Sequence, residues 1–438
     1  MPPLSRRLQA FQAASLRDPP AALEALRRDL REARGPLTEP AEGTGSGKSL
    51  VVTFVWIGPA QHVAVRGAQI LPDLMRPSHP MSRVEGTDVW HLSTTARPDI
   101  TTVYQYLVDE PEAPPTPSAD PVEPLRRQLA CAHVDPFNPA RIYPQVGLLA
   151  GEMTLPEERW EAILDLPQAE PAPWFDDAGA PPGTLTAHPF TSQALGNERT
   201  ITVYTPPGYT GTGERLPLVL LLDGECWTRV ARMHVALDNL IAAGQLAPLV
   251  VAFVHNAPAQ EKVRARIVET ACNPAFAKML AQELLPWLRA RYPLTEDPSR
   301  VVVAGNSYTG LAAAHAAFEY PEVLGAVMST SGSHWWGYAH HPLSHFLLGK
   351  DGEPEWLTRQ YAEAPRKPIR FWIDVGCLEA GMLVDWIPGV DPRAASRHFR
   401  TVLRAKGNEV HYFESPGGHE FATFRRGVVR GLRTLLGT

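Results

Sequence analysis

The sequence predicts two domains, an N-terminal β-sandwich and a C-terminal α/β domain whose mostly parallel sheet is covered by helices on both faces. Three observations carry this prediction. The chain has 438 residues, too many for one ordinary hydrophobic core. In its first part, short runs of alternating apolar residues are separated by Gly, Pro and polar turns. In its second part, continuous apolar runs alternate with helical patterns, which is typical of strands buried on both faces of a sheet.

Composition narrows the function classes. Hydrophobic residues make up 44% and charged residues 20% of the chain, as in folded globular proteins. The net charge of −6 argues against nucleic acid as a partner. No apolar run approaches the length of a membrane span, and the first residues lack the apolar core of a secretory signal. We therefore expect a cytoplasmic protein with neither a nucleic-acid nor a membrane partner.

The cysteines predict neither a metal site nor disulfide bonds. Four occur, far apart and without C-x-x-C spacing: Cys131, Cys226, Cys272 and Cys377. Such spacing suggests neither a disulfide framework nor a zinc site. We expect no metal and no other cofactor.

Residues 1–49 are expected to form two amphipathic helices and a linker. Helical patterns occupy residues 4–34, and Pro19-Pro20 opens the second helix. The polar linker contains GTGSGKS at residues 43–49, which looks like a phosphate-binding loop. Its spacing fails, since Glu42 stands where the G-x-x-x-x-G-K-S pattern needs glycine, and no strand precedes it. A flexible linker is the better interpretation.

Residues 50–146 are predicted to be the β-sandwich. Four runs have the period-two pattern and the β-branched composition of strands. These runs are Val51–Trp56, His62–Val65, Asp88–Leu92 and Thr102–Val108. Residues 147–183 are Pro-rich and acidic without sustained periodicity, so we expect a linker between the domains there.

Residues 184–438 are predicted to be the α/β domain. The runs expected to form its strands are Arg199–Thr205, Leu216–Leu222, Leu249–Val254, Val301–Ala304, Leu324–Thr330, Ile369–Val375 and Val410–Glu414. Helical patterns between and after them begin around Val230, Ala275, Leu311, Pro392 and Glu420. Catalytic groups of such sheets lie beyond the carboxyl ends of the strands, so functional residues are expected there.

The stretch Val301–Gly310, VVVAGNSYTG, combines a buried strand, a tight corner and the start of a helix. A serine at such a corner presents its hydroxyl above the sheet, close to backbone N–H groups of the next helix turn. Ser307 is therefore predicted to be the nucleophile of an α/β-hydrolase-type enzyme. The pattern departs from G-x-S-x-G at one position, because Thr309 replaces the second glycine, which follows as Gly310.

A serine nucleophile needs a base, and the base needs an acid that orients it; in this fold they follow in the chain order Ser, acid, His. His419 lies directly after the last predicted strand, in the loop SPGGH. Most other histidines downstream of Ser307 fall in helical or strand patterns or in polar loops. His419 is therefore the predicted base.

The acid is expected in the loop after the strand Ile369–Val375. Glu379 follows the run GCL, where the chain turns outward, and is the first choice. Asp374, expected on the strand itself, and Asp385 remain alternatives. Asp391 precedes a proline and is expected to cap the next helix.

Stabilising an oxyanion requires two preorganised N–H donors. One is expected from Tyr308, directly after the nucleophile. The other is expected from Gly224 or Glu225 in the run LLLDGECW, where glycine stands at a sharp strand exit.

Motifs in both parts of the chain resemble those of one known family. In the C-terminal part they are LLLDGECW, RARIVETACN followed by QELLPWLRARYPL, VVAGNSYTGLAAAHAAFEYPEVLGAVMSTSGSHWW and SPGGHEF. In the N-terminal part they are VVTFVWIGP, EGTDVWHLS, TTVYQYLV and DPFNP. Together they are similar to the enterochelin (ferric enterobactin) esterases, within the esterase D-like group. The resemblance extends from about residue 50 to the end of the chain.

The resemblance implies that Ser307 is the nucleophile, His419 the base and Glu379 the acid, with Asp223-Gly224 near the oxyanion hole. Members of the family cleave the ester bonds of a cyclic catecholate siderophore lactone and release iron in the cytoplasm. A small-molecule ester, and specifically a ferric siderophore, is therefore the implied partner.

This chain departs from the family pattern at the elbow and after the acid. The family's elbow usually reads G-Q-S-F-G-G, whereas Asn306, Tyr308 and Thr309 stand at three of these positions here. The family usually has proline after the glutamate, whereas this chain has Ala380.

A ferric tris-catecholate is anionic and aromatic, so its pocket is expected to contain cations and ring faces. The predicted substrate contacts are Arg264, Arg266, Trp227 and Trp336, with Arg229 and Trp335 as further candidates. The expected function is a metal-independent serine esterase acting on such a siderophore. The alternatives are a general carboxylesterase or acyltransferase of the same group, and a binding protein with a degenerate catalytic site.

Overall fold

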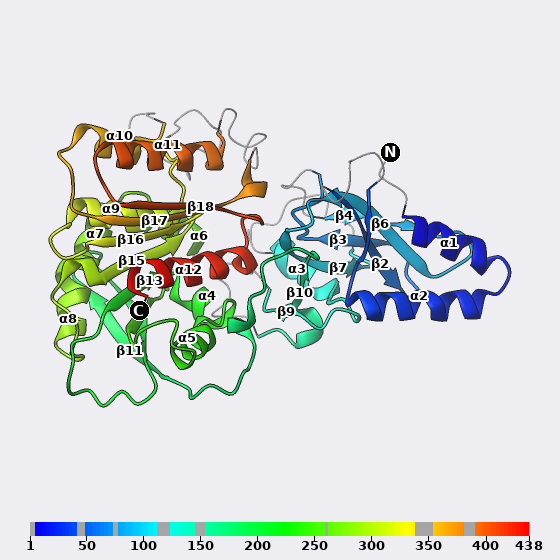
Figure 1. Ribbon diagram of the computed structural model, residues 1–438, viewed down its shortest axis with the longest axis horizontal. Coiled ribbons are helices and arrows are strands. Elements are labelled where there is room, and N and C mark those ends of the chain that lie inside the picture. Colours follow the sequence, from blue (N-terminus) through cyan, green and yellow to red (C-terminus); the bar gives the residue numbers. More distant parts are fainter. Residues whose placement is uncertain are drawn as a thin grey trace. The chain divides into compact units, whose positions relative to one another are not determined.

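The computed structural model describes residues 5–41, 49–72, 78–111, 123–144, 154–258, 262–337, 354–380 and 390–437. The chain forms two compact units, which are treated separately below (Figure 1). Unit 1 comprises residues 1–146, 152–171 and 416–422, and unit 2 comprises residues 147–151, 172–415 and 423–438. No helix among the described residues is long and apolar enough to cross a membrane.

Unit 1 contains two antiparallel sheets, of order β1-β2-β6-β5 and β4-β3-β7-β10-β9, with β8 paired to β7. The strands are β1 (Leu37–Pro40), β2 (Leu50–Ile57), β3 (Val63–Arg66), β4 (His79–Pro80), β5 (Ser82–Arg83), β6 (Val89–Ala96), β7 (Thr101–Val108), β8 (Ala132–His133), β9 (Arg141–Ile142) and β10 (Glu161–Asp165). The sheets face each other, because Phe54 of β2 packs on Tyr104 of β7 with ring centroids 5.1 Å apart and both side chains fully buried. The predicted β-sandwich is confirmed.

The described residues of unit 1 also form the α-helices α1 (Arg6–Ser15), α2 (Pro19–Ala33) and α3 (Glu123–Cys131). The two predicted N-terminal helices are confirmed, and the Asp18 carboxylate caps α2 by accepting from the Ala21 N–H. The expectation that the whole of residues 36–49 is a linker is wrong, since Leu37 is fully buried and Leu37–Pro40 pairs with β2. Most of the loop that looks like a phosphate site, residues 43–48, lies outside the described residues.

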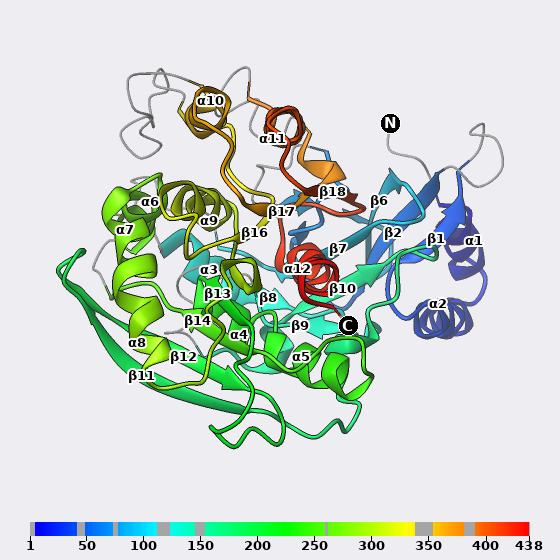
Figure 2. The same ribbon diagram turned by 60° about the vertical axis from the view of Figure 1, so that its left-hand side comes forward.

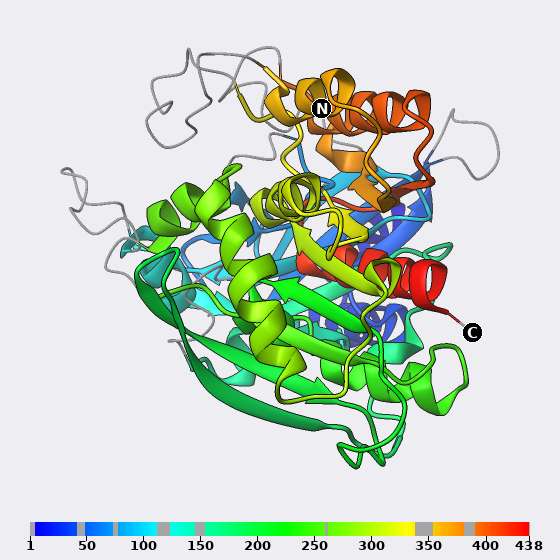
Figure 3. The same cartoon turned by 90° about the vertical axis from the view of Figure 1, so that its left-hand side faces the viewer.

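Unit 2 is built on one eight-stranded sheet of order β11-β12-β14-β13-β15-β16-β17-β18. The strands are β11 (Thr184–Ser192), β12 (Asn197–Thr205), β13 (Leu218–Leu222), β14 (Val250–Val254), β15 (Val301–Asn306), β16 (Ala326–Thr330), β17 (Arg370–Gly376) and β18 (Val410–Ser415). The strands from β14 to β18 are parallel, whereas β11 and β12 form an antiparallel hairpin at one edge (Figure 3).

The helices of unit 2 cover both faces of this sheet. They are α4 (Gly224–Arg229), α5 (Met233–Ala242), α6 (Lys262–Thr270), α7 (Pro274–Lys278), α8 (Leu285–Arg289), α9 (Tyr308–Glu319), α10 (Trp356–Glu363), α11 (Pro392–Ala405) and α12 (Phe421–Leu436). Figure 2 shows α9 and α11 on one face, with α5 and α12 on the other. On the α12 side the approach is close, because a Cβ on Gly431 would lie 2.8 Å from atoms of both Met328 and Trp372. The predicted α/β fold class, with a mostly parallel sheet between helices, is confirmed.

Candidate active site

The carboxyl ends of four neighbouring strands meet at one edge of the sheet in unit 2. Asn306 of β15 pairs with Thr330 of β16, which pairs with Asp374 of β17. Gly376, the last residue of β17, pairs with Ser415, the last residue of β18. The segments that carry the predicted nucleophile, acid and base therefore all leave the sheet at this edge.

Ser307 occupies a strained corner between β15 and α9. Its φ of 57° and ψ of −125° lie outside the regions that side chains with a Cβ ordinarily adopt. Residues at and after the end of β16 hold the corner through its backbone. The Ser307 N–H donates to the Thr330 carbonyl at 3.1 Å, and the Ser307 carbonyl accepts from the Ser333 N–H at 3.0 Å. Such strain at a serine between a strand and a helix is the geometry expected of a nucleophile elbow.

The two glycines that flank the corner are needed because neighbouring atoms leave no room for a Cβ at either position. A Cβ on Gly305 would lie 2.5 Å from the carbonyl carbon of Thr309. A Cβ on Gly310 would lie 2.8 Å from Ser329 Oγ and 3.0 Å from the Cα of Gly332. The second glycine therefore still allows α9 to pack on β16, although it stands one residue later than in the usual pattern.

Thr309, the residue that departs from the pattern, is part of the corner's hydrogen bonding. Its Oγ1 accepts from the Asn306 N–H at 3.0 Å. The hydroxyl can donate to Asp223 Oδ2 at 2.9 Å or to the Asn306 carbonyl at 2.8 Å. The side chain is almost completely buried. Threonine thus links the elbow to the strand exit at the end of β13.

Asp223 is the centre of a buried polar cluster at that strand exit. Arg266 binds it in a bidentate manner, with Nε 2.7 Å from Oδ1 and Nη2 2.5 Å from Oδ2. Asn256 Nδ2 donates to Asp223 Oδ1 at 2.9 Å and to Glu225 Oε1 at 2.8 Å. Burial acts to raise the pKa of the Asp223 carboxyl, but Arg266 and the hydrogen bonds outweigh it, so this pKa is lowered. Burial and the neighbouring Asp223 charge raise the pKa of Glu225.

The predicted oxyanion donors lie at the N-termini of two helices. Tyr308 begins α9, and Gly224 begins α4 directly after Asp223, whose φ of 62° makes the sharp turn. Only glycine fits at position 224, since a Cβ there would lie 2.6 Å from the carbonyl carbon of Phe253. The Glu225 carboxylate accepts a hydrogen bond from its own backbone N–H. Gly224 is consequently the stronger candidate of the two.

Glu379 lies in a 3₁₀ turn, Cys377–Glu379, directly after β17. Its side chain is fully buried, and Oε1 accepts from the Gly376 N–H at 2.8 Å and from Ser331 Oγ at 2.5 Å. Ser331 has a φ of 49° and donates its N–H to the Asp374 carbonyl at 2.6 Å. The carboxylate is therefore fixed close to the end of β16, the strand that neighbours the nucleophile's strand.

The alternative acids have other partners. Asp374 lies on β17, as expected, where both carboxylate oxygens accept from Ser415 Oγ at 2.7 and 2.8 Å and Oδ2 also pairs with Arg430 at 3.2 Å. Burial raises the pKa of Asp374 to about 6 although Arg430 and Ser415 act the other way. Asp391 caps α11 by accepting from two backbone N–H groups, as predicted. Asp385 lies outside the described residues.

His419 lies in the loop between β18 and α12, and this loop is grouped with unit 1. Its N–H donates to Gln69 Oε1 at 2.8 Å. Three residues lie between it and Ser415 at the sheet edge, so the two Cα atoms are at most roughly 14 Å apart along an extended chain. The structure thus brings Ser307 and Glu379 to one edge of unit 2, and the role of His419 stays a prediction.

The predicted substrate contacts receive no geometric support. Trp227 is 0% exposed and Trp336 is 2% exposed, so neither indole forms an open wall in this conformation. The Arg266 guanidinium is engaged by Asp223. Arg264 belongs to α6, but its side chain lies outside the described part of the chain. These four roles therefore stay predictions.

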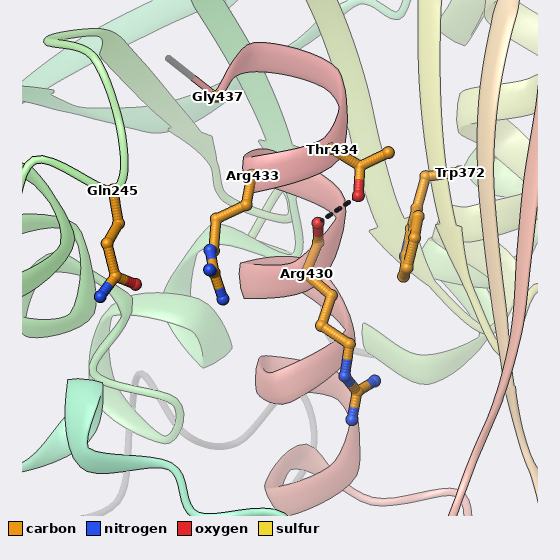
Figure 4. A pocket seen from close by; sticks show the side chains of 6 residues that line it. All are labelled: Gln245, Trp372, Arg430, Arg433, Thr434 and Gly437. Atoms are coloured by element: carbon orange, nitrogen blue, oxygen red, sulfur yellow. Dashed lines mark hydrogen bonds between the residues drawn. The ribbon is translucent and has the colours of Figure 1, made fainter.

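A hollow of about 450 Å³ lies beside the second half of α12 (Figure 4). Its lining consists of Gln245, Trp372, Arg430, Arg433, Thr434 and Gly437. None of the predicted catalytic residues lines it, so its size alone does not make it the reaction site. Within the described ranges no cluster of three or more His, Cys, Asp or Glu side chains is arranged to hold a metal ion.

Several supporting residues were not identified from the sequence. Ser331 lies in a quoted motif that assigned it no role, and Asn256 lies in none of the quoted motifs. Only the fold shows that they contact Glu379 and Asp223. Thr309 was noticeable as a departure from the elbow pattern, although its hydrogen bonds were not foreseeable.

Comparison with known proteins covers both units. Residues 192–435 match the family described as Putative esterase, and residues 51–175 match the N-terminal domain of enterochelin esterases. The iron(III) enterobactin esterase of Dickeya dadantii (strain 3937) is 28% identical over 97% of this chain and 96% of its own length. The iron(III) salmochelin esterase of Escherichia coli O6:H1 is 27% identical over 94% of this chain and 93% of its own.

Solved structures of enterobactin esterases are also similar to this chain. The ferric enterobactin esterase of Salmonella typhimurium superposes with a TM-score of 0.72 at 25% identity, covering 94% of this chain and 98% of that one. The enterobactin esterase of Shigella flexneri, solved in the presence of enterobactin, gives a TM-score of 0.71 at 26% identity, with coverages of 92% and 96%. The chain is therefore an ester-hydrolysing enzyme of this esterase family and carries the N-terminal domain of the enterochelin esterases.

Proposed function

We propose that this enzyme hydrolyses the ester bonds of a ferric catecholate siderophore of the enterobactin type, by means of Ser307, His419 and Glu379. One observation carries the substrate class. Relatives that match more than nine-tenths of their own length, across both units, are named iron(III) enterobactin esterase and iron(III) salmochelin esterase. The small-molecule ester is thus the partner, and the cytoplasmic location stays a prediction that cell fractionation would test.

In the proposed reaction, the Ser307 hydroxyl attacks the ester carbonyl while His419 accepts its proton and Glu379 orients the imidazole. The oxyanion that develops accepts hydrogen bonds from the N–H groups of Tyr308 and Gly224. Collapse of the tetrahedral intermediate expels the alcohol, which takes the proton from His419. Water, deprotonated by the same histidine, then attacks the acyl-enzyme, releases the acid and restores the serine.

Three features of unit 2 support these roles. The strained corner exposes part of Ser307 beside the first turn of α9. The Glu379 carboxylate is buried and held by two donors, which is what an orienting acid requires. Asp374, by contrast, is engaged by Ser415 and Arg430.

The test is turnover of ferric enterobactin and of short-chain p-nitrophenyl esters, with products identified by mass spectrometry. Ser307→Ala is expected to lower turnover by several orders of magnitude. Ser15→Ala, which removes an exposed hydroxyl in α1, is the matched control and should retain wild-type rates. Full turnover by Ser307→Ala would overturn the nucleophile assignment.

The same experiment separates the alternatives. Turnover of p-nitrophenyl esters without turnover of ferric enterobactin would identify the protein as a general carboxylesterase. Acyl products on added sugar or alcohol acceptors would identify an acyltransferase. Tight binding of ferric enterobactin with no labelling of Ser307 by a fluorophosphonate would identify a degenerate binding protein.

A further inference from the structure

The segment Pro416–Ala422 contains the loop between β18 and α12 and the first two residues of α12. It is grouped with unit 1 rather than with the sheet that the chain leaves at β18. This loop carries His419. The grouping has a specific basis in hydrogen bonds from one end of the loop to the other.

The start of β7 holds both sides of the loop. The Thr101 N–H donates to the Pro416 carbonyl at 2.9 Å. Glu420 Oε2 lies 3.3 Å from two donors, Thr102 Oγ1 and the Val103 N–H. Glu420 and Thr102 are fully buried. Because a buried carboxylate is costly unless its hydrogen bonds are made, the end of the loop has a defined position on this strand.

Gln69 holds the middle of the loop, at the histidine itself. Its Oε1 accepts from the His419 N–H at 2.8 Å, and its own N–H donates to Thr102 Oγ1 at 3.1 Å. The Gln69 side chain packs directly on Gly418, where any added Cβ would overlap Oε1. The turn closes on itself, since the Glu420 N–H donates to the Gly418 carbonyl at 3.0 Å. The backbone at His419 is therefore fixed by a side chain of the sandwich.

We infer that Gln69 is a positioning residue for His419, because its side chain holds the backbone of the loop that carries the proposed base. This inference rests on the proposed role of His419. A base must lie within hydrogen-bond reach of its nucleophile, and a displacement of about 1 Å can lower the rate by about 100-fold. A residue that holds the base, and touches no substrate, is expected to act on kcat rather than on KM.

The test compares Gln69→Ala with Gln69→Glu in the full-length protein. Gln69→Ala removes the acceptor of the His419 N–H, so kcat for a p-nitrophenyl ester is expected to fall by about 10- to 100-fold while KM changes less than about twofold. Gln69→Glu keeps an oxygen acceptor at the same reach and is expected to restore most of kcat. Gln61→Ala is the matched control, because Gln61 is exposed in the same domain.

A second variant tests the same contact from the other side. Gly418→Ala forces the Gln69 side chain away and is expected to lower kcat and the rate of Ser307 labelling by a fluorophosphonate in the same proportion as Gln69→Ala. Wild-type kcat in both variants would overturn the inference. A rise in KM with unchanged kcat would also overturn it, since Gln69 would then be a substrate contact.

His419→Ala separates this inference from the proposed function. If His419→Ala retains wild-type kcat, the assignment of the base is wrong. If His419→Ala is inactive while Gln69→Ala and Gly418→Ala equal Gln61→Ala, the base assignment stands and the positioning role of Gln69 is refuted.

Discussion

The hydroxyl of Thr309 provides a sharp test of how the altered elbow is stabilised. In Thr309→Val the shape of the side chain is kept and the hydroxyl is lost. The Asn306 N–H then loses its acceptor at 3.0 Å, and Asp223 Oδ2 loses a donor at 2.9 Å. Thr309 is 1% exposed, so water does not replace these partners.

The expected magnitude follows from the two lost hydrogen bonds. A buried donor left without a partner costs about 1–3 kcal/mol, and a hydrogen bond to a charged group contributes about 1.5–3 kcal/mol. Asp223 keeps its bidentate pair with Arg266, so we expect the free energy of unfolding to fall by less than the full sum, by about 2–4 kcal/mol. For a domain of this size that change lowers Tm by roughly 4–16 °C.

Scanning calorimetry measures this difference, and loss of esterase activity on heating identifies the transition of unit 2. Thr309→Ser is the control, because it keeps the hydroxyl and loses one buried methyl group, which contributes about 1 kcal/mol. If Thr309→Val unfolds within about 1 °C of Thr309→Ser, the hydroxyl does not stabilise the corner and the reasoning is refuted.

Three further predictions concern the same edge of the sheet. Gly305→Ala places a Cβ 2.5 Å from the Thr309 carbonyl carbon, so fluorophosphonate labelling of the elbow serine should be lost, and normal labelling would contradict the close approach. Ser331→Ala removes a donor to Glu379 that contributes about 1.5–3 kcal/mol, so kcat should fall about tenfold or more with KM unchanged; an unaltered kcat would show that this donor is dispensable. Because burial raises the pKa of Asp374 from 3.8 to about 6, the folded state binds this proton more tightly than the unfolded chain, and its stabilising contribution is lost as pH rises from about 4 to 6. Asp374→Asn should therefore gain in Tm relative to wild type across this range, and a Tm difference that does not change with pH would contradict the shift.

Much of the fold was predictable because its signals are local. Every strand from β12 to β18 overlaps a run that the sequence marks as a strand, and β13 to β16 are buried along their whole length. The hairpin strand β11 was not predicted, since most of its residues are exposed and no apolar pattern marks it. β10 was not predicted either, because it lies in a Pro-rich segment and forms by pairing with β7, far away in the sequence.

The position of the elbow, the cap at Asp391 and the strand ends at which catalytic groups are expected could be predicted from the sequence, because strand periodicity, turn residues and capping depend on neighbours along the chain. The partners of charged and polar side chains became known only from the folded chain. Arg266, predicted to contact substrate, pairs with Asp223 43 residues away, and Glu379 rather than Asp374 receives the Ser331 hydroxyl. Likewise, Gln69 meets His419 across 350 residues of sequence. Such contacts depend on which strand ends lie side by side in the folded sheets. A local sequence pattern does not show which distant residues become neighbours.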